Sequence, residues 1–336
     1  MRARWHIIPL AWSLAASADE SPDFIFPVAC HYGVDCFIQN YVDHDPTAGY
    51  SDYQCRQQTY DGHSGTDIRL INLPQMDKGV PVLAAASGKV VATRDGVTDA
   101  YLDPARREEI KRIGLGNAVV IQHSHGWRTI YGHLKKGSLT IKKGDHVIQG
   151  QSLGEIGLSG LTEFPHVHFQ VTHHNKTIDP FIGKPDRGKC GDTLNSQWLG
   201  TADNKITYFP GLLLDQGFSK TPPENYRTIE TGNFNKGSGD KSQHLFFWVR
   251  FIGLSMGDQV TLSFVAPNSE RIREHSFPKL KSSKAQQLYY IGIKNPAIQP
   301  GRPGRWQGGV RLERTSMPPI NKVFDYAVGV EDVTDR

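Results

Sequence analysis

Apolar and polar residues alternate in a series of short runs along this chain, and turn-forming residues separate one run from the next. Alternation of this kind places every second side chain on the same face of a β-strand. Between residues 61 and 185, the runs that predict strands are 66–70, 80–85, 88–94, 118–124, 127–134, 146–148 and 167–172. The pattern predicts a mainly β fold whose core is an antiparallel sheet.

A second set of strand-like runs follows a stretch rich in polar residues and glycine, which we interpret as a linker over residues 186–204. These runs are 245–251, 260–265, 288–293, 306–312 and 323–328. Short strands between turn residues are typical of a sandwich. We therefore predict a C-terminal β-sandwich domain over residues 205–336, which could bind a partner or brace the rest of the chain.

The segment from Asp99 to Ile113 departs from the alternating pattern and is rich in charged residues. Asp103 is a suitable N-cap, and proline is favoured in the first turn of a helix, where Pro104 stands. The segment predicts a short helical insertion, which could line one rim of a groove.

The first residues have the layout of a secretory signal. A basic start over residues 1–4 is followed by an apolar stretch from Trp5 to Ala16 and by small residues up to Ala18. The apolar stretch is shorter than the ~20 residues that span a bilayer. We expect residues 1–18 to be a signal peptide cleaved near Ala18, with an uncleaved anchor as the alternative, and a periplasmic or secreted chain without an integral membrane segment.

All four cysteines lie beyond the predicted signal, and an even number in an exported protein favours disulfides. Four cysteines allow three connectivities. We prefer Cys30 with Cys36, which closes a short loop, and Cys55 with Cys190, which flank the predicted core. The absence of a Cys-x-x-Cys pair argues against zinc binding by cysteine. Residues 19–60 otherwise read as an irregular N-terminal extension.

A length of 336 residues suits about two domains of ordinary size. The formal net charge is +4, and acidic and basic residues are interspersed. This balance gives no case for nucleic-acid binding.

Three stretches hold histidines at spacings that suit a metal site: His63-Ser-Gly-Thr-Asp67, Tyr131-Gly-His133 and His166-Val-His168. Residues two or four apart on a strand share a face and can converge on one ion, and Gly65 leaves room between the first two. Catalytic zinc usually takes three His or carboxylate ligands and keeps a fourth position for water. The spacing leaves open which of His166 and His168 is the ligand.

With these motifs, the stretch from 61 to 183 resembles the LytM/lysostaphin-like zinc endopeptidases (the duplicated hybrid motif peptidases), which cut peptide bonds in bacterial cell walls. The resemblance extends to Gly114-Leu-Gly116-Asn117 and to Lys143-Gly144-Asp145 with the residues up to Gln151. It implies one Zn²⁺ per chain held by His63, Asp67 and His168, with His133 and His166 as the catalytic histidines. Glu163 and Phe164 depart from the smaller residues that are common in the family.

The resemblance implies a LytM-like zinc peptidase domain over residues 61–185, acting on the peptide stems of peptidoglycan. We expect His166 to assist the attacking water and His133 to stabilise the tetrahedral intermediate, while Tyr131 either contributes a hydroxyl or packs in the core. Both D-alanyl to diaminopimelate crosslinks and Gly-Gly bridges stay open as substrates.

Two other functions compete with the peptidase. One is a non-enzymatic regulator or activator of other wall hydrolases on the same fold, and the other is an adhesion protein whose sandwich binds the wall. A further possibility is autoinhibition, in which the N-terminal extension covers the groove and supplies a fourth ligand. The candidates for that ligand are His31, Asp43, His44 and Asp45.

Overall fold

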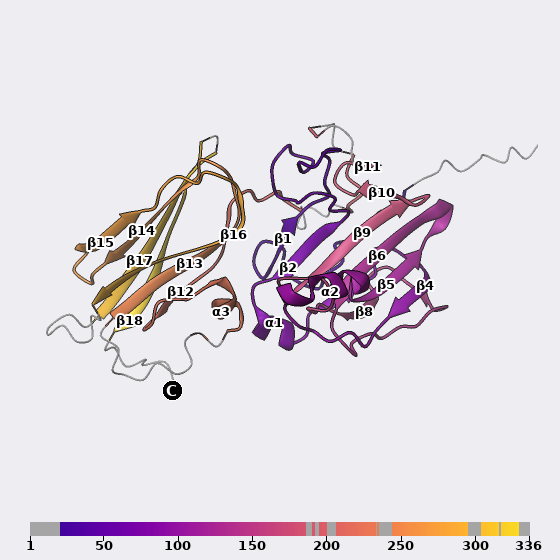
Figure 1. The fold of residues 1–336 in the computed structure, drawn as a ribbon, viewed down its shortest axis with the longest axis horizontal. Helices are drawn as coiled ribbons and strands as arrows, with labels where there is room; N and C mark the ends of the chain where they lie inside the picture. The colour runs from indigo at the N-terminus through magenta and orange to yellow at the C-terminus, as the bar shows by residue number, and fades with distance from the viewer. Residues whose placement is uncertain are drawn as a thin grey trace, which may run out of the picture.

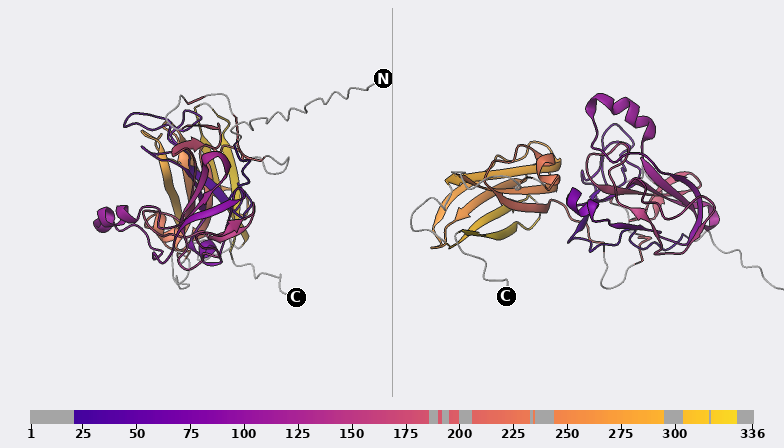
Figure 2. Two further views of the ribbon diagram at one scale, coloured as in Figure 1. Left: turned by 90° about the vertical axis from the view of Figure 1, so that its right-hand side faces the viewer. Right: turned by 90° about the horizontal axis from the view of Figure 1, so that it is seen from below.

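The computed structural model describes residues 21–185, 190–191, 195–199, 206–232, 234, 244–294, 304–315 and 317–328. Two β-rich bodies lie side by side, one built mainly from the first half of the chain and one from the second (Figures 1 and 2). The predicted signal peptide lies outside the described residues. Among the described helices, none is long and apolar enough to cross a membrane.

The first body is built on a nine-stranded sheet. Seven strands follow the order β1-β2-β9-β6-β5-β4-β7, β10 extends from β9, and β11 pairs with β10. Their bounds are β1 (Cys36–Asn40), β2 (Thr66–Leu70), β4 (Gly88–Arg94), β5 (Asn117–Gln122), β6 (Trp127–Leu134), β7 (His146–Val147), β9 (His166–His173), β10 (Lys176–Asp179) and β11 (Lys184–Pro185). A separate pair consists of β3 (Pro81–Leu83) and β8 (Ser152–Glu155), and short helical turns are α1 (Leu73–Asp77) and η2 (Ser124–Gly126). All pairings within the sheet are antiparallel, which confirms the predicted fold class.

Strand β9 shows how the alternating sequence builds this sheet. Val167, Phe169 and Val171 are buried in the hydrophobic core. His166 and His168 alternate with them and therefore lie on the other face. One strand thus supplies both core packing and two imidazoles to the same side of the sheet.

The N-terminal extension is more regular than its sequence predicts. Residues 36–40 form β1, an edge strand that pairs with β2, so the expectation of an irregular extension was wrong there. Disulfides join Cys30 to Cys36 and Cys55 to Cys190, which confirms the preferred connectivity.

The helical insertion is present as predicted. It consists of η1 (Pro104–Arg106) and α2 (Arg107–Ile113), and it projects from the body in the right-hand view of Figure 2. The Asp103 carboxylate accepts a hydrogen bond from the Ala105 amide at 2.9 Å, which is the cap that the sequence indicates.

The second body contains two antiparallel sheets. One has the order β12-β13-β16 and the other β15-β14-β17-β18. Their bounds are β12 (Leu212–Ser219), β13 (His244–Leu254), β14 (Gln259–Val265), β15 (Arg271–Ser276), β16 (Lys284–Lys294), β17 (Gly304–Glu313) and β18 (Ile320–Val328), with helix α3 (Tyr226–Glu230) after β12. Phe247 from the first sheet and Phe264 and Trp306 from the second share one buried core. The domain boundaries drawn from the sequence stay a prediction.

Buried charges connect the two bodies. The Arg69 guanidinium of β2 pairs with the Glu230 carboxylate of α3, and the Arg250 guanidinium of β13 lies 3.6 Å from the same carboxylate. Arg250 also pairs with Asp215 at 2.8 Å. Arg69, Arg250 and Glu230 are all buried.

Candidate metal centre and active site

The sheet brings the three histidine-bearing stretches together. Strand β9 lies between β2 and β6, and its residue His168 pairs with Asp67 on one side and with Gly132 on the other. His63 precedes β2 in an irregular segment, so the expectation that it shares a strand face with Asp67 was wrong. Its side chain nevertheless lies beside those of Asp67 and His168.

His63, Asp67 and His168 offer three atoms that face one another. The Asp67 Oδ1 atom lies 3.1 Å from His63 Nε2 and 2.9 Å from His168 Nδ1, and the two nitrogens are 3.3 Å apart. Atoms on a tetrahedron ~2.0–2.1 Å from zinc are about 3.3 Å apart. The three atoms are therefore spaced as ligands of one such ion would be, and these residues form a cluster able to hold a metal.

The hydrogen bond of the His63 ring leaves a nitrogen lone pair that can bind a cation. Its Nδ1 atom donates to the backbone carbonyl of Tyr41 at 2.6 Å, so in the neutral ring Nε2 carries a lone pair that faces the Asp67 carboxylate. Two acceptors 3.1 Å apart repel each other unless a proton or a cation lies between them. Burial opposes ionisation of Asp67, but His63 and His166 hold the pKa of this carboxyl well below its usual range.

Two neighbours keep these groups in place. The Asn40 side chain donates to Asp67 Oδ2 at 2.9 Å, leaving Oδ1 for the centre. A Cβ atom at Gly65 would lie 2.6 Å from the His168 ring, which no side chain tolerates without displacing it. The role predicted for Gly65 therefore has a direct steric basis.

His133 and His166 lie beside this cluster with their Nε2 atoms available. His133 Nδ1 donates to the Ser159 carbonyl at 2.7 Å, and His166 Nδ1 donates to the Phe164 carbonyl at 2.9 Å. The two ring centroids are 4.6 Å apart, and His166 Nε2 is 3.5 Å from Asp67 Oδ1. Burial and the adjacent rings of His166 and His168 hold the pKa of His133 well below its usual range.

The backbone at His133 is unusual. Its φ of 60° lies in the left-handed region, which non-glycine residues rarely adopt. The register between β5 and β6 shifts at this point, between Asn117 and Val119. Such strain costs of order 1–3 kcal/mol and is concentrated at functional sites.

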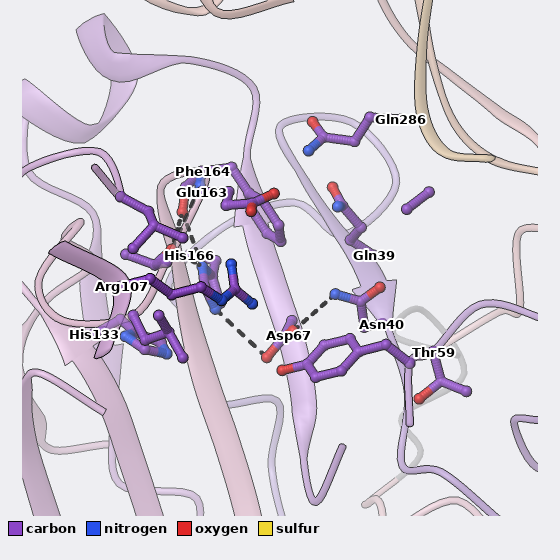
Figure 3. A pocket seen from close by; sticks show the side chains of 15 residues that line it. Gln39, Asn40, Thr59, Asp67, Arg107, His133, Glu163, Phe164, His166 and Gln286 are labelled. Atoms are coloured by element: carbon purple, nitrogen blue, oxygen red, sulfur yellow. Dashed lines mark hydrogen bonds and ion pairs between the residues drawn. The ribbon is translucent and has the colours of Figure 1, made fainter. Parts of the chain in front are cut away.

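A cavity of about 350 Å³ opens at the cluster (Figure 3). Asp67, His133 and His166 line it, and so do residues that the sequence analysis did not single out. These are Gln39, Asn40, Thr59, Tyr60, Leu102, Arg107, Leu161, Thr162, Ala285 and Gln286. Leu161 and Thr162 come from the loop before β9, and the others from the extension, the insertion and the second body, which only the fold brings together.

Other candidate residues lie away from the centre. The Tyr131 hydroxyl accepts from the Ala85 amide at 2.8 Å inside the core, so this side chain packs and contributes no hydroxyl to the site. The His44 Nε2 atom forms a hydrogen bond with the Asp179 carboxylate at 2.8 Å. Asp43 and Asp45 accept hydrogen bonds within their own loop, and His31 is exposed beside Asp35. None of the four residues considered for autoinhibition supplies a fourth ligand.

Comparisons with known proteins agree with this geometry. Residues 61–180 match the family model described as Peptidase family M23. Peptidoglycan DD-endopeptidase ShyB of Vibrio cholerae is 32% identical over 117 residues, which cover 35% of this chain and 22% of that protein. Cell division protein DipM of Caulobacter vibrioides is 30% identical over 121 residues, covering 34% of this chain and 17% of that protein.

Among solved structures, a zinc-containing peptidase from Vibrio cholerae is 26% identical with a TM-score of 0.28, covering 42% of this chain and 38% of that one. The chain spans about a fifth of the length of the two curated relatives. The matched range includes the three cluster residues and the two histidines beside them. The chain therefore carries a peptidase family M23 domain over residues 61–180, as its sequence resemblance indicates.

Proposed function

We propose that this protein is a zinc metalloendopeptidase that hydrolyses peptide crosslinks of bacterial peptidoglycan, with one Zn²⁺ per chain. The observation that carries the proposal is the convergence of His63 Nε2, Asp67 Oδ1 and His168 Nδ1 within 3.3 Å of one another, at a cavity lined by two further histidines. Zinc bound there would lower the pKa of its water to about 7 and polarise the scissile carbonyl.

The two histidines beside the metal site, His133 and His166, would transfer protons during the reaction. His133 is neutral at pH 7 because burial and neighbouring rings lower its pKa, so its Nε2 atom is a proton acceptor. His166 also gives its Nδ1 atom to a carbonyl and presents Nε2 to the cavity. The two Nε2 atoms would share the proton transfers, with His166 assisting the attacking water and His133 serving the tetrahedral intermediate, as the sequence analysis expects.

We infer that the signal peptide over residues 1–18 exports the chain to the periplasm or the medium. The two disulfides support this, because such bonds persist in oxidising compartments. We further propose a peptidase domain over residues 61–185, preceded by the extension over residues 19–60, and a β-sandwich domain over residues 205–336.

The test is an assay of the purified mature chain on crosslinked muropeptides, with mass spectrometry of the products and of bound metal. His63→Ala should lose both zinc and turnover, because one of three ligands is gone. His133→Ala should keep zinc and lose turnover by about 10²-fold or more, the usual contribution of a group in general acid–base catalysis. His146→Ala is the matched control, since His146 is an exposed histidine of the same sheet.

The rival is a non-enzymatic regulator, a class that the name of the relative DipM keeps open. It predicts no products from the unaltered chain and no effect of His133→Ala on binding to a partner hydrolase. Release of cleaved stem peptides by the unaltered chain but by neither histidine variant would exclude it.

A further inference from the structure

The cavity beside the metal centre has walls from three parts of the chain. His133 and His166 lie on the core sheet, Arg107 on the helical insertion, and Ala285 and Gln286 at the start of β16 in the second body. Figure 3 shows Arg107 pointing into the cavity and Gln286 beside Gln39 on its far side. A ligand that fills this cavity therefore also contacts groups outside the core sheet.

Arg107 is the unpaired cation of this cavity. Two other cations of the insertion pair with its own glutamates, Arg106 with Glu109 and Lys111 with Glu108, each at 2.8 Å, and Arg112 does not line the cavity. No acidic side chain among the described residues pairs with Arg107. Two carboxylates line the same cavity, those of Asp67 and Glu163. Asp67 is already engaged by Asn40 and by imidazoles, and Glu163 forms no ion pair with Arg107 in the described part of the chain.

The two glutamines add donors to the same cavity. Arg69 Nη1 donates to the Oε1 atoms of both Gln39 and Gln286, the latter at 2.9 Å. A guanidinium has no acceptor, so this contact fixes which end of each amide is the oxygen. The NH₂ group of each amide is left to donate to a ligand in the cavity.

We propose that Arg107 binds a free carboxylate next to the scissile bond, and that Gln39 and Gln286 donate to carbonyl oxygens of the same peptide. This inference rests on the proposed peptidase function and names its substrate class. A D-alanyl to diaminopimelate crosslink carries a carboxylate on the carbon bonded to the scissile nitrogen, whereas a Gly-Gly bridge carries none. Arg107 is thus the residue that selects crosslinks of the first type.

The test uses the full chain and two crosslinked muropeptide dimers that differ only in whether this carboxylate is free or amidated. The unaltered protein should cleave the free acid with a kcat/KM at least about tenfold higher, since charge-assisted hydrogen bonds are the strong ones. Arg107→Gln should lower kcat/KM for the free acid by roughly 10- to 100-fold, mainly through KM, and leave the amidated dimer unchanged. Arg107→Lys should give an intermediate kcat/KM for the free acid, because lysine keeps the positive charge but cannot form two parallel hydrogen bonds with a carboxylate.

Arg106→Gln is the matched control, because Arg106 is the adjacent arginine and is paired on the surface with Glu109. It should behave like the unaltered chain. Equal cleavage of both dimers by the unaltered protein would overturn the inference, and so would an equal loss on both dimers in Arg107→Gln.

Binding separates this inference from the peptidase proposal. Calorimetry with His133→Ala should show the free acid bound about tenfold more tightly than the amide. His133→Ala/Arg107→Gln should show no preference. A binding preference without cleavage by the unaltered chain would refute the endopeptidase and keep the role of Arg107, whereas equal binding of the two dimers would refute the role of Arg107 alone.

Discussion

At the scale of single residues, the site depends on which nitrogen of each imidazole the backbone holds. His63, His133 and His166 all give Nδ1 to a backbone carbonyl and present Nε2 to the centre. His168 differs, because its Nδ1 atom faces Asp67. The sequence predicts the histidines and their grouping, but the choice of nitrogen depends on the carbonyls of Tyr41, Ser159 and Phe164, which lie outside the strands.

His123 makes stability depend on pH. Its Nδ1 atom donates to the Ser87 carbonyl at 2.8 Å, and its Nε2 atom accepts from the Thr129 hydroxyl at 2.9 Å. Burial lowers the pKa of His123, although the Ser87 carbonyl opposes the shift. The ring is neutral in the folded chain, whereas in the unfolded chain it takes up a proton near pH 6.5.

The unfolded state therefore binds more protons below about pH 6.5, and the free energy of unfolding should fall as the pH drops from 7 to 5. In His123→Gln this side chain no longer takes up a proton on unfolding. The slope of the free energy of unfolding against pH should therefore become less steep, by up to about 1.4 kcal/mol per pH unit. Urea unfolding of both proteins at a series of pH values measures the slopes. Parallel curves would show that His123 does not contribute.

At the scale of elements, strands with alternating sequences were predictable and the others were not. Residues 66–70, 88–94 and 127–134 were predicted as strands and form β2, β4 and β6 with the same bounds. The sequence of β1, Cys-Phe-Ile-Gln-Asn, does not alternate, because three apolar residues are followed by two polar ones. Strand β15 is largely exposed and polar, and therefore lacks the apolar signal as well.

The insertion offers a test at this scale. Asp103→Ala removes a cap of η1 worth about 1 kcal/mol, so the amides of η1 and of α2, which continues from it, should exchange roughly fivefold faster with solvent. The midpoint of global unfolding should stay the same, because no residue of α2 is buried. Asp103→Asn is the control, since asparagine caps as well as aspartate. Hydrogen exchange measured by mass spectrometry distinguishes the variants, and equal exchange in all three would contradict the capping role.

At the scale of the whole molecule, buried charges fix the second body against the first. Arg69 joins β2 to α3 through Glu230, and its guanidinium lies 4.7 Å from the Phe164 ring, which packs against the ring of His166. The sequence could not predict this contact. Its members are far apart along the chain, and charged residues are expected at the surface unless paired.

Glu230 is the anion on which this junction depends, because both Arg69 and Arg250 face it. Glu230→Gln keeps the shape of the side chain but leaves Arg69 buried without a counter-charge, which typically costs 3–5 kcal/mol. We expect a loss of about 3 kcal/mol, since Asp215 still pairs with Arg250. Glu109→Gln breaks an exposed pair instead and should cost less than about 1 kcal/mol. Urea unfolding of the two variants measures this difference, and equal losses would mean that the junction does not depend on the buried charge.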